Sequence, residues 1–279
     1  MIRLRRKSQA LVAALIAALL VSACTRGGVH RWHPNLYSVD QDINLGRRLS
    51  KQVEEEVPIL RHSTLTQLIN GIGRRLLTDP PHPAFLNFPY AFTVVDSPEI
   101  NAFALPGGSV YVNSGLVTLL DTEDQLAAVI AHEMSHVAAR HATEILTTVN
   151  ASNFLLLVTL SVIPVAIPPT ALEGARLAYI LSLLRYSRGK ESEADTLGIR
   201  MMWNAGYDPG EMATVFRRFQ EERRAAPTLL ERLFSSHPVS SDRMHTVEEQ
   251  AAALGLPPVL DPSPAALPHG QVRAMFAKE

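Results

Sequence analysis

A short histidine–glutamate motif is the part of the 279-residue sequence best suited to chemistry. It reads His132-Glu133-Met134-Ser135-His136. Residues four apart on a helix lie on one face, about one turn apart, so both imidazoles can bind the same metal ion. Glu133 is then placed to act as a general base on a metal-bound water. The motif therefore predicts a hydrolytic site with one Zn²⁺ ion per chain.

The residues around the motif favour a metal site over a chance match. Leu126, Val129, Ile130 and Val137 make the surrounding helix apolar. Ionisable side chains in such a helix are costly unless they have partners, and a metal ion is one such partner. The alternative, a helix whose histidines only form hydrogen bonds in the core, is the weaker interpretation.

A catalytic zinc site needs a third protein ligand and an open coordination position. The metzincin pattern would place glycine and histidine three and six residues beyond the second histidine, but Ala139 and Ala142 occupy those positions. His141 lies nine residues from His132, about half a turn round a continuous helix. We therefore expect His141 to face away from the site and to have a structural role.

The acidic segment Glu191-Ser192-Glu193-Ala194-Asp195 supplies the remaining candidates. Glu191 and Asp195 share one helix face, whereas Glu193 points roughly the opposite way and is expected to be solvated. We assign Glu191 as the third ligand. Asp195 would hold a ligand imidazole through its free N–H or assist proton transfer. Without the upstream motif, a charged helix face with ordinary ion pairs would be the favoured interpretation.

Two helices must carry these residues. The capping box Thr122-x-x-Gln125 predicts the start of a long helix from about Glu123 to Thr148. A second helix, from Leu172 to Asn204, would carry the acidic segment. The small Gly198 on this second helix permits a close approach between the two, which would place the carboxylates beside the histidines.

The segment before the motif changes from a helical to a strand-like pattern. Asp40 to Leu60 and Thr64 to Leu77 have the periodicity of amphipathic helices. Tyr90 to Val95 is rich in aromatic and β-branched residues, which suits a strand. Phe103 to Leu105 and Ser109 to Asn113 are expected to form a tight hairpin around a Pro-Gly-Gly turn.

The first residues have the features of a bacterial export signal. A basic stretch precedes the apolar Leu11 to Val21, and Ser22-Ala23 supplies small residues at a cleavage point. Cys24, the only cysteine, follows directly, and Leu20 to Cys24 resembles a lipobox, in which the cysteine becomes lipidated. The alternative is an ordinary signal peptide with an incidental cysteine. Thr25, in place of aspartate, favours the outer membrane.

The composition supports a folded exported protein. Hydrophobic residues make up 47% of the chain, charged residues 19%, and the net charge is -1. No basic stripe indicates a nucleic-acid partner. The apolar run Phe154 to Ile167, which contains Pro164, is shorter than the roughly 20 residues that span a bilayer. It is interpreted as a buried core helix or, alternatively, as a mobile lid or a segment that dips into the membrane surface.

The combined motifs resemble a known family of metallopeptidases. The resemblance is carried by three features: the zinc motif followed by Arg140-His141, Ser187-Arg188 before Glu191-x-x-x-Asp195, and Asn101 to Gly115. The chain is similar to the family that includes HtpX, BepA, LoiP and the CAAX prenyl proteases, and especially to its bacterial periplasmic branch. The resemblance covers about Asp40 to Glu249.

This resemblance implies zinc ligands at His132, His136 and Glu191, with Glu133 as the base. It implies that the strand Ser109 to Asn113 lies beside the cleft and pairs with an extended substrate peptide. Ser236-His237-Pro238 and Arg243 resemble a segment whose histidine approaches the metal. His237 is therefore a candidate for an inhibitory fourth ligand or for a stabiliser of the oxyanion, the alternative being a histidine on a surface loop.

The fold expected from these observations is α+β, a predominantly helical zincin-type domain with a small antiparallel sheet at the active-site cleft. The expected organisation is a signal peptide over residues 1–23, a tether over 24–39, the metallopeptidase domain over 40–256 and a Pro/Ala-rich tail over 257–279. Unlike some family members, the chain shows no convincing transmembrane helix after the signal and no long helical-repeat extension.

The predicted function is zinc-dependent cleavage of misfolded or misassembled envelope proteins at the periplasmic face of the outer membrane. The expected partners are unfolded polypeptides, the membrane through lipidated Cys24, and the outer-membrane assembly machinery. One alternative is a lipoprotein chaperone or assembly factor that binds outer-membrane proteins with little or no proteolysis. Another is a purely structural zinc site, whose loss would unfold the protein.

Overall fold

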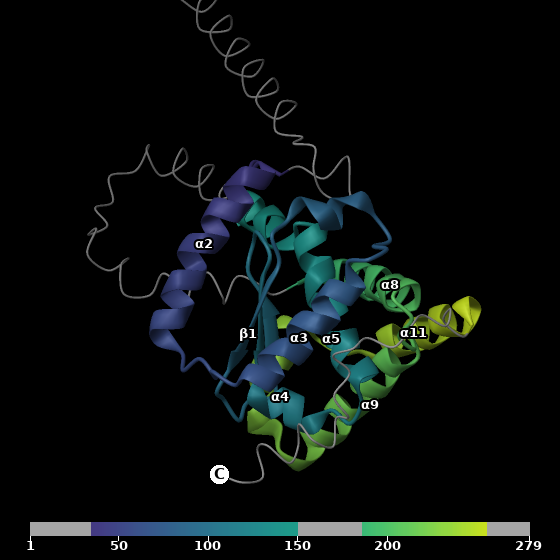
Figure 1. The fold of residues 1–279 in the computed structure, drawn as a ribbon. Helices are drawn as coiled ribbons and strands as arrows, with labels where there is room; N and C mark the ends of the chain where they lie inside the picture. Colours follow the sequence, from purple (N-terminus) through teal and green to yellow (C-terminus); the bar gives the residue numbers. More distant parts are fainter. Residues whose placement is uncertain (1–34, 150–185, 256–279) are drawn as a thin grey trace, which may run out of the picture.

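The computed structural model describes residues 35–149 and 186–255. Figure 1 draws the remaining ranges, 1–34, 150–185 and 256–279, as a thin grey trace. The expected signal peptide, Cys24, the apolar run Phe154 to Ile167 and the tail therefore lie outside the described residues. Within the described ranges, no helix combines the length and the apolar character that crossing a membrane requires.

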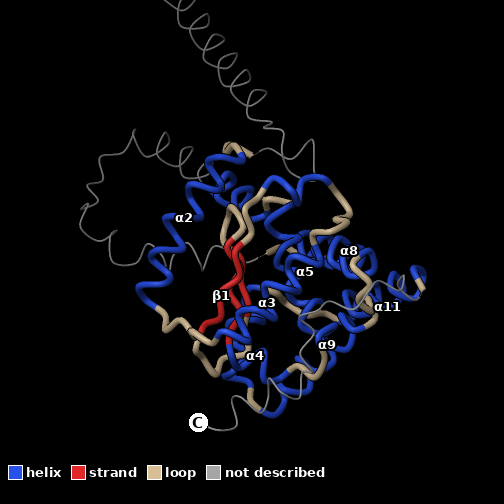
Figure 2. Tube along the Cα trace, in the orientation of Figure 1, coloured by secondary structure: helices blue, strands red, loops and turns tan. Residues whose placement is uncertain are grey.

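The described chain is α+β, as predicted, with helices around one small sheet (Figure 2). In chain order the elements are α2 (Val39–Glu56), α3 (Ser63–Leu76), η1 (Pro83–Asn87), β1 (Ala91–Val95), β2 (Ala102–Ala104), β3 (Ser109–Asn113), α4 (Ser114–Leu119), α5 (Glu123–Ala138), α8 (Arg188–Asn204), α9 (Glu211–Ala225), η3 (Pro227–Leu230), α10 (Glu231–Ser236) and α11 (Ser241–Leu254). Residues 141–149 are also helical.

The sheet is mixed rather than antiparallel. Its strand order is β1-β3-β2, with β1 parallel and β2 antiparallel to β3. The predicted hairpin between β2 and β3 is confirmed, but the prediction of a wholly antiparallel sheet was wrong. The sequence of β3 explains its central place: Val110, Tyr111 and Val112 are all buried, so both faces of this strand are covered.

The two faces of the sheet pack against different helices. Val110 and Val112 belong to the main core, which includes the buried faces of α3 and α5. Tyr111 points the other way, into a smaller cluster with Leu49 and Val53 of α2. Figure 1 accordingly shows α2 on one side of the sheet and α3 and α5 on the other.

Helix α5, which carries the zinc motif, lies at the centre of the domain. Every residue from Gln125 to Ala138 is buried, and α5 packs against α3, α8, α9 and β2. As predicted, the helix begins at Glu123, and the side chain of its N-cap residue Thr122 accepts a hydrogen bond from Gln125 N–H. The predicted capping box is only half formed, because the Gln125 side chain accepts from Asp121 N–H instead of Thr122 N–H. A helix that is covered on all sides has little freedom to move, which suits it to hold ligands in fixed positions.

The helix predicted to run to Thr148 is interrupted two residues after Ala138. Arg140 has a φ of 61°, and residues 141–149 form a separate helical segment. A non-glycine residue in the left-handed region is strained unless its surroundings hold it there. The buried guanidinium of Arg140 is held by Asp42, with contacts of 2.7 and 3.1 Å, and by the carbonyl of Tyr37.

The second predicted helix also begins later than expected within the described range. Tyr186 and Ser187 are not helical, and the Ser187 side chain caps α8 by accepting a hydrogen bond from Lys190 N–H. Gly198 then allows the close approach of α8 and α5 that the sequence predicted. A Cβ atom there would lie 3.4 Å from His132 N and 2.9 Å from the Met212 side chain.

Candidate metal centre

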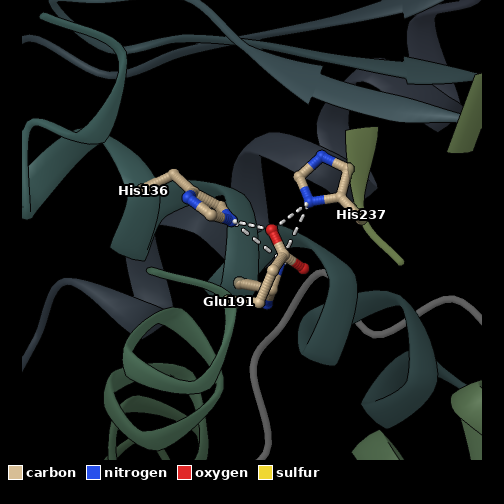
Figure 3. A group of neighbouring side chains, drawn as sticks. His136, Glu191 and His237 are labelled. Carbon is tan, nitrogen blue, oxygen red and sulfur yellow. Dashed lines mark hydrogen bonds and ion pairs between the residues drawn. The ribbon is translucent and has the colours of Figure 1, made fainter. Parts of the chain in front are cut away.

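Four buried side chains from three parts of the chain converge on one point. His132 and His136 come from α5, Glu191 from the first turn of α8, and His237 from the residue after α10. One ligand atom from each lies within 4.8 Å of all the others. Figure 3 shows His136, Glu191 and His237 directed toward one another. All four were candidates from the sequence, and the structure brings them together.

The interatomic distances within this group are short and similar. His132 Nε2 lies 3.0 Å from His136 Nε2 and 3.3 Å from His237 Nδ1. Glu191 Oε1 lies 3.3 Å from His136 Nε2 and 3.1 Å from His237 Nδ1. Because His237 is only 5% exposed, the alternative of a surface-loop histidine was wrong. Glu191 is fully buried, so it does not belong to an exposed charged helix face.

Asp195 lies behind His132, where it can support a ligand imidazole, one of the two roles expected from the sequence. Its Oδ1 is 3.0 Å from His132 Nδ1, the ring nitrogen that faces away from the four-residue group. The negative charge of a carboxylate at this distance favours a ring proton on Nδ1, which leaves Nε2 free for a metal ion. The Glu191-x-x-x-Asp195 spacing thus puts one carboxylate inside the group and one behind it.

Two residues contradict their predicted orientations. His141 does not face away: its Nδ1 lies 2.8 Å from His136 Nδ1. Glu193 is not solvated, because its side chain is 19% exposed and its Oε2 lies 3.2 Å from His141 Nε2. The prediction that His141 lies half a turn away from His132 assumed an unbroken helix. The left-handed conformation of Arg140 breaks that helix and redirects the following residue.

Arg243 of α11 connects several parts of the site. Its Nη1 lies 2.6 Å from Glu191 Oε2, and its Nε and Nη2 donate to Asp195 at 2.8 and 2.7 Å. Nη1 also donates to the carbonyl of Pro238, beside His237. The sequence offered Arg243 only as part of a family segment. No local spacing signals its role at the site, because its two carboxylate partners lie about 50 residues away.

Tyr186 is a further neighbour that the sequence did not indicate. Its ring stacks on the ring of His136, with centroids 3.9 Å apart and planes 18° apart. The backbone N–H of Tyr186 donates to Ser236 O, next to His237. Tyr186 therefore packs against one histidine of the group and is tied to the segment that carries another.

The strand expected to pair with a substrate is not at the edge of the sheet. β3 is hydrogen-bonded to β1 on one side and to β2 on the other, so the expectation of a free edge at Ser109–Asn113 was wrong. The shorter β2 is an edge strand of this sheet, and it packs against α5. Ala104 of β2 and His136 line the same pocket.

Comparisons with known proteins place this site in a family. The sequence profile of peptidase family M48 matches residues 69–251, more than half of the chain. The chain belongs to peptidase family M48. The matched range includes all four converging side chains and Glu133.

Three relatives illustrate the similarity of this M48 chain to known proteins. It is 31% identical over 265 residues to the beta-barrel assembly-enhancing protease of Escherichia coli K12, covering 88% of this chain and 53% of that protein. The protein of the same name from Yersinia pestis is 30% identical over 223 residues, which cover 77% of this chain and 44% of that protein. Mitochondrial metalloendopeptidase OMA1 of Schizosaccharomyces pombe is 34% identical over 159 residues, which cover 56% of this chain and 45% of that protein. The chain thus spans about half the length of these relatives.

M48 metallopeptidases use zinc, and the residues present here fit that ion. Imidazole and carboxylate are typical zinc ligands, with bonds of about 2.0–2.1 Å, so tetrahedral ligand atoms lie roughly 3.3 Å apart. Four of the separations between His132, His136, Glu191 and His237 are 3.0–3.3 Å and match this spacing, whereas His132 Nε2 and Glu191 Oε2 are 3.7 Å apart. Two imidazole Nε2 atoms that face each other at 3.0 Å need an ion or a proton between them.

The protonation states of two candidate ligands suit a cation. Burial lowers the pKa of His136 well below its usual value, so the ring is neutral near pH 7. Burial alone would raise the pKa of Glu191, but the charge of His237 and the hydrogen bonds from His136 and His237 outweigh it. The pKa of Glu191 is therefore held well below its usual value. A neutral imidazole and an ionised carboxylate are the forms that bind a metal. His237 must first lose its proton to do so, because burial would lower its pKa but the charges of Glu191 and Glu133 outweigh that effect and raise the pKa to about 9.

Glu133 lies beside this group without joining it. Its side chain is buried, and its Oε1 is 3.6 Å from His237 Nε2. Its Oε2 is also buried, and no hydrogen-bond partner for it occurs among the described residues. A buried carboxylate oxygen needs a partner, and a water molecule at the metal centre would provide one. Glu133 thus presents one carboxylate oxygen that a water molecule beside this group can reach.

Proposed function

We propose that this M48 chain is a zinc-dependent endopeptidase that cleaves misfolded or misassembled proteins of the bacterial envelope. The observation that carries the proposal is the buried carboxylate of Glu133 beside the group His132, His136, Glu191 and His237. A base next to a metal site is the arrangement used for metal-assisted hydrolysis. The similarity to a protease named for β-barrel assembly supports envelope proteins as the substrate class.

The proposed mechanism divides its tasks among residues of the chain. His132, His136 and Glu191 would hold the zinc ion, which supplies Lewis-acid polarisation of the scissile carbonyl and a nucleophile at neutral pH. Glu133 would accept the proton of the attacking water on Oε2 and deliver it to the departing amine. Asp195 would keep the ring of His132 in the orientation that ligation needs.

His237 would determine whether the site is open. A catalytic zinc site keeps one position free of protein ligands, whereas four protein ligands close it. His237 Nδ1 lies 3.1 Å from Glu191 Oε1 and 3.3 Å from His132 Nε2, which supports a fourth ligand that withdraws when a substrate enters the site. If the histidine withdraws, its imidazole can instead donate to the oxyanion that develops on the substrate.

Substrate peptides would bind along β2. In the β2–β3 ladder, hydrogen bonds join Asn113 N to Asn101 O and Leu105 N to Ser109 O. Because bonded pairs alternate in an antiparallel ladder, the backbone groups of Ala102 and Ala104 point away from β3. An extended peptide can pair with such an edge by main-chain hydrogen bonds, with little dependence on its sequence. That tolerance suits a protease for misfolded proteins.

The proposed location rests on the sequence. Lipidation of Cys24 would anchor the chain to the periplasmic face of the outer membrane, with Thr25 favouring that membrane over the inner one. This location would bring the site close to outer-membrane proteins and to their assembly machinery. It is consistent with the name of the Escherichia coli relative, which links that protein to β-barrel assembly.

The experiment that tests the proposal combines metal analysis with cleavage of casein by wild type and Glu133→Gln. The expected result is one zinc per chain in both proteins and cleavage by the wild type only. Cleavage at the wild-type rate by the variant would refute the role of Glu133. If neither protein cleaves, His237→Ala provides the next comparison, and cleavage by that variant would demonstrate latency.

A complementation assay separates proteolysis from a binding function. If the chain acts as a chaperone or assembly factor that needs no hydrolysis, Glu133→Gln should restore growth to a deletion strain as well as the wild type does. We expect it to fail while being present at a wild-type level. Removal of zinc by a chelator should silence the enzyme and leave it folded, whereas unfolding would indicate a structural zinc site.

A further inference from the structure

His141 and Glu193 form a chain of contacts that ends on one of the candidate zinc ligands. His136 Nδ1 lies 2.8 Å from His141 Nδ1, and His141 Nε2 lies 3.2 Å from Glu193 Oε2. The opposite nitrogen of His136, Nε2, lies within the four-residue group. His141 is fully buried, so no solvent competes for its ring nitrogens.

The positions of the protons along this chain follow from metal binding. A histidine that binds a metal through Nε2 carries its ring proton on Nδ1. The Nδ1–H of His136 must then donate to His141 Nδ1, so the proton of a neutral His141 lies on Nε2. This Nε2–H donates in turn to the carboxylate of Glu193. One assignment of protons therefore satisfies both contacts and leaves His136 Nε2 free.

We propose that His141 and Glu193 are positioning residues that fix the tautomer and the ring orientation of His136. The proposal rests on the proposed function, because it takes His136 as a zinc ligand. It gives the two ligand histidines equivalent support: Asp195 contacts His132 Nδ1 directly, whereas Glu193 reaches His136 Nδ1 through His141. Partners of this kind hold metal ligands in their binding orientation.

Two neighbouring features hold the chain of contacts in place. The left-handed conformation of Arg140, fixed by Asp42, turns the backbone so that the next residue returns toward His136. The ring of Tyr186 stacks on one face of the ring of His136. A rotation of His136 away from His141 would therefore break both a buried hydrogen bond and a stacking contact. The surrounding structure restricts the ring to the orientation that ligation requires.

Two substitutions of His141 separate hydrogen bonding from packing. In His141→Asn, the side-chain oxygen can take the place of Nδ1 and accept from His136, whereas His141→Leu fills a similar volume without an acceptor. We expect His141→Leu to weaken zinc affinity roughly 10–100-fold, the range typical of such partners. His141→Asn should stay within a few-fold of wild type. Equal affinities for the two variants would overturn the proposal.

The measurement uses the full chain and has readouts besides proteolysis. Zinc affinity is measured by competition with a chromophoric chelator, and the visible spectrum of the Co²⁺-substituted protein reports ligand geometry. His141→Leu should change that spectrum and His141→Asn should preserve it. If His141→Leu does not fold, Glu193→Ala replaces it, because it removes the acceptor for His141 at the partly exposed end of the chain. Unchanged zinc affinity in Glu193→Ala would then contradict the proposal.

A reference variant distinguishes this inference from the proposed function. His136→Ala should lose zinc and activity. If it retains both, the proposed ligand set is wrong. If it loses zinc while His141→Leu binds zinc as tightly as wild type and has the same Co²⁺ spectrum, the ligand set stands and only the positioning role of His141 and Glu193 is refuted.

Discussion

The guanidinium of Arg243 contacts the carboxylate of Glu191 inside the metal centre, with Nη1 2.6 Å from Oε2. The same side chain donates two hydrogen bonds to Asp195, which lies behind His132. One buried cation thus balances two buried carboxylates that support the site. Without this cation, both carboxylates would be left in a low-dielectric interior, where an unpaired charge is costly.

We therefore predict that Arg243→Gln impairs both metal binding and folding. Loss of the buried pair should destabilise the protein by about 3–5 kcal/mol and weaken zinc affinity roughly 10–100-fold. Thermal unfolding and chelator competition measure the two effects. Arg217→Gln is the matched control, because the Arg217–Glu248 pair is about half exposed on both sides. Its effect should stay below about 1 kcal/mol. Similar losses in both variants would contradict the role of Arg243.

A second prediction compares two glutamates on the same helix. Glu191→Gln should weaken zinc binding far more than Glu193→Gln, because only the first removes a charged ligand atom from the metal centre. Glutamine at position 193 keeps an oxygen that can accept from His141, so a few-fold change is expected there. Metal content after dialysis against a chelator provides the measurement. Equal retention of zinc by the two variants would refute the ligand assignment.

The features that the sequence predicted are those with local causes. The i,i+4 spacing of His132 and His136 and the capping of α5 at Thr122 are fixed within one or two turns of helix. The β2–β3 hairpin follows from the turn at Gly107 and Gly108, which both have positive φ. Four candidate ligands were identified because their residue types are rare in apolar helices and their family segments are specific.

The features that the sequence did not predict depend on residues far apart in the chain. Arg140 adopts a left-handed conformation because Asp42, 98 residues away, holds its guanidinium. That conformation places His141 against His136, which the count of residues along one helix could not show. The central position of β3 likewise depends on β1, which pairs with it directly in parallel although β2 comes between them in the sequence.

The proposed lipid anchor gives a third prediction. Cys24→Ser should release the protein from the membrane fraction, because lipidation needs the thiol of this only cysteine. Fractionation of cells that express wild type and variant at equal levels measures the effect, and Ser22→Thr, which leaves the thiol in place, is the matched control. If the Cys24→Ser protein stays in the membrane fraction after its signal is removed, the apolar run Phe154 to Ile167 becomes the explanation for membrane attachment.

A fourth prediction concerns the backbone of Arg140. Arg140→Ala removes the buried pair with Asp42 and keeps a residue that is strained at a φ of 61°. Arg140→Gly removes the same pair, but glycine adopts positive φ without strain. Both variants should be destabilised by about 3–5 kcal/mol through the uncompensated Asp42. Glycine should nevertheless be the milder change by about 1 kcal/mol, because a left-handed non-glycine residue costs that much.

Arg200 provides the control for this comparison, because it is an exposed residue within α8, four residues before its last residue, Asn204. In a helix interior, glycine is less favourable than alanine by about 1 kcal/mol. Chemical denaturation should therefore show the glycine variant to be the more stable of the two at position 140 and the alanine variant to be the more stable at position 200. If glycine is the more damaging substitution at both positions, the left-handed conformation of Arg140 costs little. The ion pair with Asp42 would then account for the break in the helix without opposing any backbone strain.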